Sequence, residues 1–99
     1  MPMNATLFKN GRVYWDGRFQ QGDLLVQDGK IQSFGTLAVS DAQQVDLDGK
    51  LLVPGFIDIH IHGGAGVDVN GADKAGFCRI GRFFAAHGVT GWLCSILTD

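Results

Sequence analysis

Two histidines, His60 and His62, stand two residues apart, and this spacing is the clearest indication of a functional site in the sequence. They close the apolar run of residues 56–62, which is typical of a β-strand. Because side chains alternate along a strand, both imidazoles project from the same face. Neutral imidazole nitrogens bind a divalent cation at about 2.0–2.1 Å. We therefore predict that His60 and His62 bind a divalent metal, zinc first, with iron or another divalent ion as alternatives. A hydrogen-bonded or solvent-exposed histidine pair is the non-functional interpretation.

The neighbours of this pair are weaker candidates for the same site. Asp58 shares the histidine face, where it could orient a metal ligand or simply bond backbone amides. Ile57, Ile59 and Ile61 share the opposite face, which we expect to pack under helices. A glycine-rich loop follows at residues 63–70, and Gly63 and Gly64 could let a substrate approach the backbone. A tight turn that needs glycine for its dihedral angles is the interpretation we favour for this loop.

The elements after the loop indicate how the strand is supported. Residues 72–87 predict a helix with an apolar stripe of Phe77, Ile80 and Phe84, capped by Asn70 and ended by Gly88. Residues 89–97 predict a second strand. A strand, a helix and a strand in succession form a βαβ unit with parallel strands. The fold class is therefore α/β, and this unit is expected to be the first of a (β/α)8 TIM-type barrel, which needs about 250 residues to close.

The first half of the chain predicts a different architecture. Short strands at residues 5–8, 12–15, 23–27, 30–34, 44–47 and 51–53 alternate with Asn-Gly and Asp-Gly turns, which favours antiparallel hairpins. This half has no cluster of metal-ligating residues and is expected to be a structural β module. Pro54 and Gly55 mark the boundary. The predicted domains are residues 1–54 and residues 55–99.

The composition excludes several classes of partner. Hydrophobic residues make up 45% and charged residues 18% of the chain, as in ordinary globular proteins, and the net charge is -2. A nucleic-acid binder would carry a basic patch, so we expect no nucleic-acid partner. No apolar run approaches the roughly 20 residues that span a membrane, and there is no secretory signal, so we expect no membrane partner and a cytoplasmic location. Cys78 and Cys94 are expected to be buried free thiols.

At these residues the sequence resembles the amidohydrolase superfamily. The stretch LLVPGFIDIHIH (residues 51–62) is similar to the start of its barrel, and DLLVQDGKIQSFG (residues 23–35) is similar to a segment of the small β-sandwich that accompanies the barrel. The continuation HGGAGVD (residues 62–68) is similar to the N-acetylglucosamine-6-phosphate deacetylase branch. The stretch GVTGWLCSILT (residues 88–98) resembles the second barrel strand of that branch, although Gly91 and Cys94 depart from it.

The resemblance implies an activity that this chain completes only with further residues. It implies metal-assisted hydrolysis of N-acetylglucosamine 6-phosphate to glucosamine 6-phosphate and acetate, in a homodimeric parent enzyme. The catalytic Asp, a Glu and two more His would lie beyond Asp99, so the chain is expected to be an N-terminal fragment that is inactive alone. Because some members hold one metal without this pair, the pair could serve a second metal. Two alternatives remain open: an amidohydrolase acting on a cyclic amide, of the dihydroorotase or hydantoinase kind, and a non-catalytic remnant or interaction module.

Overall fold

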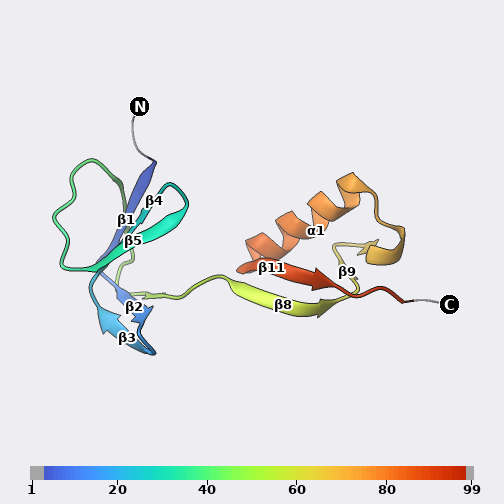
Figure 1. Cartoon of the computed structure of the whole chain (residues 1–99), viewed down its shortest axis with the longest axis horizontal. Helices are drawn as coiled ribbons and strands as arrows, with labels where there is room; N and C mark the ends of the chain where they lie inside the picture. Colours follow the sequence, from blue (N-terminus) through green and yellow to red (C-terminus); the bar gives the residue numbers. More distant parts are fainter. Residues whose placement is uncertain (1–3, 98–99) are drawn as a thin grey trace. The chain divides into compact units, whose positions relative to one another are not determined.

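The chain divides into two compact units, Met1–Pro54 and Gly55–Asp99, and a computed structural model describes residues 4–97 of them (Figure 1). Strands make up most of the regular structure, and one α-helix accompanies them. Within residues 4–97, no helix is both long and apolar enough to cross a bilayer. In its described residues, 4–54, the regular elements of the first unit are strands: β1 (Ala5–Lys9), β2 (Arg12–Trp15), β3 (Arg18–Gln21), β4 (Asp23–Gln27), β5 (Lys30–Gly35), β6 (Gln43–Asp46) and β7 (Leu51–Leu52).

The strands of the first unit form two sheets, one in the order β5-β4-β1-β6 and one in the order β3-β2-β7. Two of the predicted turns close hairpins. Asp16 and Gly17, with φ of 52° and 82°, join β2 to β3, and Asp28 and Gly29, with φ of 52° and 78°, join β4 to β5. Positive φ at both central residues is the geometry of the type I′ turn, whose twist matches that of the flanking strands.

The other turn signals have a different role, which corrects the expectation of hairpins throughout. The turn at Asn10 takes the chain from β1 to β2, and the turn at Asp48 takes it from β6 to β7, so each connects strands of different sheets. The pairs β1–β6 and β2–β7 are consequently parallel. Strand β3 was also not predicted, because its polar sequence RFQQ lacks the apolar alternation that indicates a strand.

A side-chain hydrogen bond ties the turn after β1 to β6. The Nδ2 atom of Asn10 donates to Oδ1 of Asp46 at 2.8 Å. This bond, together with the backbone amide of Asp48 that donates to the same oxygen, lowers the pKa of the Asp46 carboxyl below its ordinary value. The corner is exposed, so the bonds fix its geometry more than they stabilise the unit.

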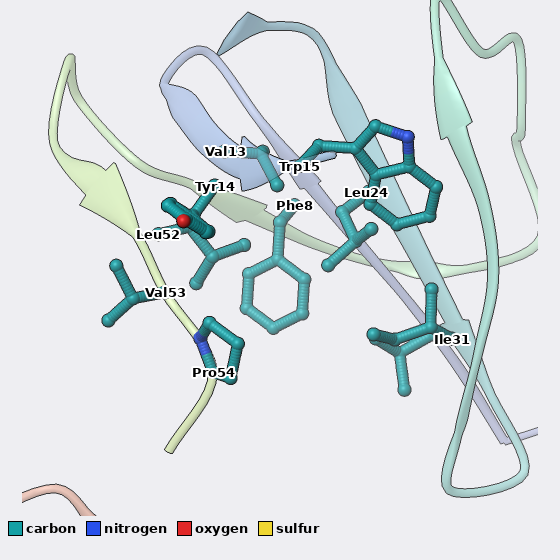
Figure 2. A pocket seen from close by; sticks show the side chains of 10 residues that line it. Phe8, Val13, Tyr14, Trp15, Leu24, Ile31, Leu52, Val53 and Pro54 are labelled. Atoms are coloured by element: carbon teal, nitrogen blue, oxygen red, sulfur yellow. The ribbon is translucent and has the colours of Figure 1, made fainter. Parts of the chain in front are cut away.

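An apolar hollow of about 220 Å3 lies within the first unit (Figure 2). Figure 2 shows the ring of Phe8 near the centre of the side chains that line it, with Tyr14, Leu52 and Pro54 to one side and Leu24 and Ile31 to the other. Its lining contains no carboxylate, imidazole or thiol. The lining is therefore almost entirely apolar, and the hydroxyl of Tyr14 is its one titratable side-chain group.

The second unit contains a strand, a helix and a strand, with a small ribbon between the first two. Its elements are β8 (Phe56–Ile61), β9 (Gly63–Gly64), β10 (Val67–Asp68), the 3-10 turn η1 (Val69–Gly71), α1 (Lys74–Ala86) and β11 (Val89–Cys94). Strands β8 and β11 are parallel, as the βαβ pattern predicts. The expected loop of residues 63–70 is instead an antiparallel pair of β9 and β10, turned at Ala65 and Gly66 with φ of 52° and 80°.

The ends of α1 partly confirm the predicted caps. The N-cap is Asp73, whose Oδ1 accepts from the amide of Gly76 at 2.8 Å, so the prediction of Asn70 as the cap is wrong. Asp73 competes better because it stands directly before the first helical residue, where its carboxylate also meets the positive end of the helix dipole. Gly88 has φ of 86°, which is the left-handed geometry predicted for the residue that ends the helix.

Helix α1 lies along the β8–β11 pair and forms a small core with it (Figure 1). Ile61, Val69 and Ile80 are buried there, and Phe84 and Trp92 pack edge to face at 5.5 Å against them. The predicted helix stripe is therefore confirmed at Ile80 and Phe84 but not at Phe77, which is exposed. Of the three isoleucines expected to pack under helices, Ile61 is buried, whereas Ile57 and Ile59 are exposed.

The expectation of buried thiols is wrong, because Cys78 and Cys94 are both exposed. Cys78 lies on the side of α1 away from the apolar stripe, two residues before the buried Ile80. Cys94 is the last residue of β11 and is exposed there. An apolar residue type alone does not specify which face of an element is covered.

Gly81 shows why a glycine is tolerated inside α1. A Cβ atom built on Gly81 would lie 2.9 Å from Cη2 of Trp92, so the helix approaches β11 closely at this point. Alanine normally stabilises a helix interior by about 1 kcal/mol over glycine, but forcing a methyl group against a ring costs about 1–3 kcal/mol. We expect Gly81→Ala to lower the free energy of unfolding by about 1 kcal/mol in urea titrations. The same change should become stabilising when Trp92→Leu removes the ring, and stabilisation with Trp92 present would contradict the packing argument.

Candidate metal centre

The C-terminal end of β8 brings the two histidine rings together. The Nε2 atoms of His60 and His62 are 3.1 Å apart, and the ring centroids are 5.0 Å apart. Two nitrogens that bind one zinc ion at tetrahedral angles lie about 3.3 Å apart, because each metal–nitrogen bond is about 2.0–2.1 Å. The observed distance of 3.1 Å between the two Nε2 atoms is therefore close to what one shared cation requires. Both rings are exposed, so a cation could reach them from solvent.

A backbone carbonyl fixes the orientation of one of these rings. The Nδ1 atom of His62 lies 3.2 Å from the carbonyl oxygen of Ser95, in the segment that follows β11. A carbonyl oxygen only accepts, so this contact places the proton of the neutral ring on Nδ1. The lone pair of Nε2 is then free, which is the tautomer that a metal ligand at Nε2 needs.

The same reasoning gives the proton arrangement of the metal-free pair. If Nε2 of His62 carries a lone pair, the Nε2–H group of His60 donates to it across the 3.1 Å contact. A divalent cation would take the place of that single proton, and the neutral ring of His60 would then carry its proton on Nδ1. The pair thus forms a two-nitrogen site that a proton holds together when no cation is bound.

Asp58 does not join the pair. Its Oδ1 accepts from the backbone amide of His60 at 3.1 Å, which is one of the two roles considered for it. The carboxylate therefore shapes the strand end, and within residues 4–97 no hydrogen bond joins it to either imidazole. Within residues 4–97, no group of three or more His, Cys, Asp or Glu side chains is placed to hold a metal ion.

Packing explains the two glycines after the histidines. A Cβ atom on Gly63 would overlap the carbonyl oxygen of Val67 on the paired strand β10. A Cβ atom on Gly64 would lie 3.2 Å from the ring of Phe84 in α1. Close approach of backbone and ring therefore accounts for both glycines, while the positive φ that was expected falls on Ala65 and Gly66.

Sequence reasoning missed two residues that support the site. Ser95 contributes a backbone carbonyl, which leaves no trace in residue type. Asn70 was assigned to the helix cap, but its side chain bonds both backbone groups of Leu97. Only the pairing of β8 with β11, which carries residues 95–97 past the histidines, could have indicated these contacts.

Known structures resemble this chain over all or most of its length. N-acetyl-D-glucosamine-6-phosphate deacetylase from Mycobacterium smegmatis, solved with N-acetyl-D-glucosamine-6-phosphate, superposes with a TM-score of 0.78 at 25% identity, covering 100% of this chain and 26% of that one. The ochratoxinase of A. niger superposes with a TM-score of 0.53 at 17% identity, covering 93% of this chain and 25% of that one, and this likeness concerns the fold alone. No family model matches the chain.

Curated sequences give a second set of matches. Dihydroorotase from Ligilactobacillus salivarius is 40% identical over 62 residues, which are 59% of this chain and 14% of that protein. Dihydroorotase from Lactobacillus leichmannii is 49% identical over 59 residues, again 59% of this chain and 14% of that protein. The resemblance to the amidohydrolase superfamily is confirmed. The chain spans about a seventh of these dihydroorotases, so the activity of the whole amidohydrolase is a matter for proposal.

The two sets of matches point to different branches of the amidohydrolases. The superposition favours a deacetylase, whereas the sequence matches favour a dihydroorotase. The glycine-rich continuation after His62 resembles the deacetylase branch, but the sequence matches to dihydroorotases leave the branch undecided.

Proposed function

We propose that this chain supplies the first two metal ligands, His60 and His62, of a metal-dependent amidohydrolase that cleaves an amide C–N bond. The observation that carries the proposal is the 3.1 Å approach of the two Nε2 atoms, with Nδ1 of His62 facing the Ser95 carbonyl. A divalent ion, zinc first, would lower the pKa of water and polarise the amide carbonyl. The residues of this chain hold the two nitrogens, exclude the wrong tautomer of His62 and shape the strand end through Asp58.

The same proposal gives the two units their roles. Residues 55–99 would form the first βαβ unit of a (β/α)8 barrel, in which ligands at the C-terminal ends of strands face the active site. Residues 1–54 would form a segment of the accompanying β-sandwich. Gly63 and Gly64, which form β9, would lie beside the substrate because they directly follow His62.

For the substrate we favour N-acetylglucosamine 6-phosphate. The support is the superposition over the whole chain on a deacetylase solved with that molecule. The second candidate is a dihydroorotase-type reaction on a cyclic amide, favoured by sequence matches of 40% and 49% identity. Both candidates use the same two histidines, so the substrate can be tested separately from the metal site.

Two chimaeras test the substrate. In one, this chain replaces the matching segment of the Mycobacterium smegmatis deacetylase, and in the other it replaces the matching segment of the Ligilactobacillus salivarius dihydroorotase. We expect the first chimaera to release acetate from N-acetylglucosamine 6-phosphate and the second to be inactive on dihydroorotate. Activity of the second alone would favour the dihydroorotase candidate. Two folded but inactive chimaeras would contradict the proposed enzyme role.

The chain alone is expected to hydrolyse neither substrate. It offers two imidazole nitrogens, but Asp58 is bonded to the amide of His60 and no third ligand joins the pair within residues 4–97. A general base must lie within hydrogen-bond reach of the attacking water. Purified chain with zinc should therefore release acetate no faster than zinc in buffer. Sustained release that depends on His62 would contradict this expectation.

A further inference from the structure

Asn70 forms a two-point clamp on the segment that follows β11. Its Nδ2 atom donates to the carbonyl oxygen of Leu97 at 2.6 Å, and its Oδ1 atom accepts from the amide of Leu97 at 3.2 Å. A side-chain amide that bonds both groups of one residue fixes the direction of that backbone as well as its position. The clamp joins η1 to a segment 27 residues away in the sequence.

The clamped segment carries the carbonyl that faces His62. Ser95 lies two residues before Leu97, and its own amide donates to the carbonyl oxygen of Ile61 at 2.7 Å. The backbone of residues 95–97 is therefore held at the Ser95 amide by β8 and at Leu97 by Asn70. Between these two points, the Ser95 carbonyl lies 3.2 Å from Nδ1 of His62.

Asn70 is itself held in place, which lets it act as an anchor. Its amide donates to Oδ1 of Asp68 at 2.9 Å, and the neighbouring amide of Val69 donates to the carbonyl oxygen of His62 at 2.8 Å. Val69 is buried in the small core of the unit. These contacts form a continuous path of hydrogen bonds. The path starts at the His62 backbone, runs through η1 and residues 95–97, and returns to the His62 imidazole.

We propose that Asn70 is a positioning residue for His62: through the Leu97 clamp it keeps the Ser95 carbonyl on Nδ1 and so keeps the Nε2 lone pair free. The proposal rests on the proposed metal role of His62 for its functional meaning. A neutral histidine in water prefers the proton on Nε2, so the ring needs a fixed acceptor beside Nδ1 to adopt the opposite tautomer. Without the clamp, the hydrogen bonds described for residues 95–97 are the Ser95 amide bond to Ile61 and the contact of the Ser95 carbonyl with His62 itself, so the carbonyl is free to turn away.

The tautomer of His62 distinguishes two roles of Asn70: positioning the His62 ring, or only fixing the backbone of residues 95–97. The chain contains three histidines, so 15N-histidine labelling gives three imidazoles to assign, in solution or in sedimented protein. The metal-free chain is compared with Asn70→Ala and Asn70→Asp at a pH where the rings are neutral. Asn70→Asp keeps the acceptor for the Leu97 amide but places a carboxylate oxygen against its carbonyl. The control is Asn10→Ala, which removes a side-chain bond in the first unit.

We expect His62 to carry its proton mainly on Nδ1 in the chain and in Asn10→Ala, and to shift toward Nε2 in both Asn70 variants. Far-UV circular dichroism of α1 should stay unchanged, which shows that the unit is folded. An Nδ1–H tautomer that persists in both folded Asn70 variants would overturn the proposal. Loss of the helix signal in both variants would also overturn it, because Asn70 would then support the whole unit and not the ring.

Zinc binding gives the second readout. Outer contacts of a ligand typically change metal affinity by about 10–100-fold, and Asn70 acts one step further away, so we expect a loss of roughly three- to tenfold in Asn70→Ala. The Asn10→Ala control should bind zinc as the unchanged chain does. If the unchanged chain binds no zinc, the proposed function fails while the tautomer result still decides the role of Asn70. A tautomer shift with unchanged zinc affinity would overturn the link between the clamp and the metal site.

Discussion

Replacing His62 with alanine is expected to lower the affinity of the chain for zinc by at least about tenfold. A single imidazole binds zinc without a second ligand held nearby at high effective concentration. His60→Ala should have the same effect, since the two Nε2 atoms are 3.1 Å apart and act as one chelating pair. The double replacement should weaken binding little beyond either single one, because each single change already removes the chelate. Isothermal titration with zinc chloride measures all three.

The matched control for these variants is His87→Ala. The Nδ1 atom of His87 lies 2.8 Å from the carbonyl oxygen of Phe83 at the end of α1, so this ring serves the helix terminus. Its removal should leave zinc affinity unchanged. Equal losses in all three single variants would mean that zinc binds histidines at random, and the pair would not be a site.

The second large effect is expected at Gly63. Gly63→Ala would place a methyl group on the carbonyl oxygen of Val67, and neither atom belongs to a side chain that can turn away. The β9–β10 ribbon must then separate, and the bond from the Val69 amide to the His62 carbonyl is strained with it. We expect the free energy of unfolding of the second unit to fall by about 3 kcal/mol or more.

Gly71→Ala is the control, because a Cβ atom at Gly71 meets nothing within 4 Å. Its effect should stay within about 0.5 kcal/mol. Urea titrations in a Trp15→Phe background make Trp92 the tryptophan that reports on the second unit. A Gly63→Ala chain as stable as the Gly71→Ala chain would show that the ribbon does not need the close approach.

The sequence predicted the parts of the site that depend on local pattern. Alternation along residues 56–62 places both imidazoles on one face, and the βαβ order predicts the parallel pairing of β8 with β11. Glycine at a helix end likewise predicts the left-handed conformation of Gly88. These features follow from strand and helix periodicity and from backbone sterics, which act within a few residues.

The features that the sequence did not predict depend on contacts between distant segments. The Ser95 carbonyl meets His62 across 33 residues, and Asn70 meets Leu97 across 27. A backbone carbonyl has no residue-type signal, and an Asn before a helix is equally suited to a cap. The prediction of buried cysteines failed because residue type does not say which surfaces another element covers. Strand β3 was missed because its polar sequence lacks apolar alternation.

The central claim is that His60 and His62 together bind one divalent ion, and X-ray absorption at the zinc edge tests it most directly. The chain is loaded with less than one equivalent of zinc, and the same measurement is made on the His60→Ala/His62→Ala chain. The account predicts two imidazole nitrogens at about 2.0–2.1 Å, with the imidazole scattering absent in the double variant. A spectrum with only oxygen neighbours, or one that the double variant leaves unchanged, would contradict it.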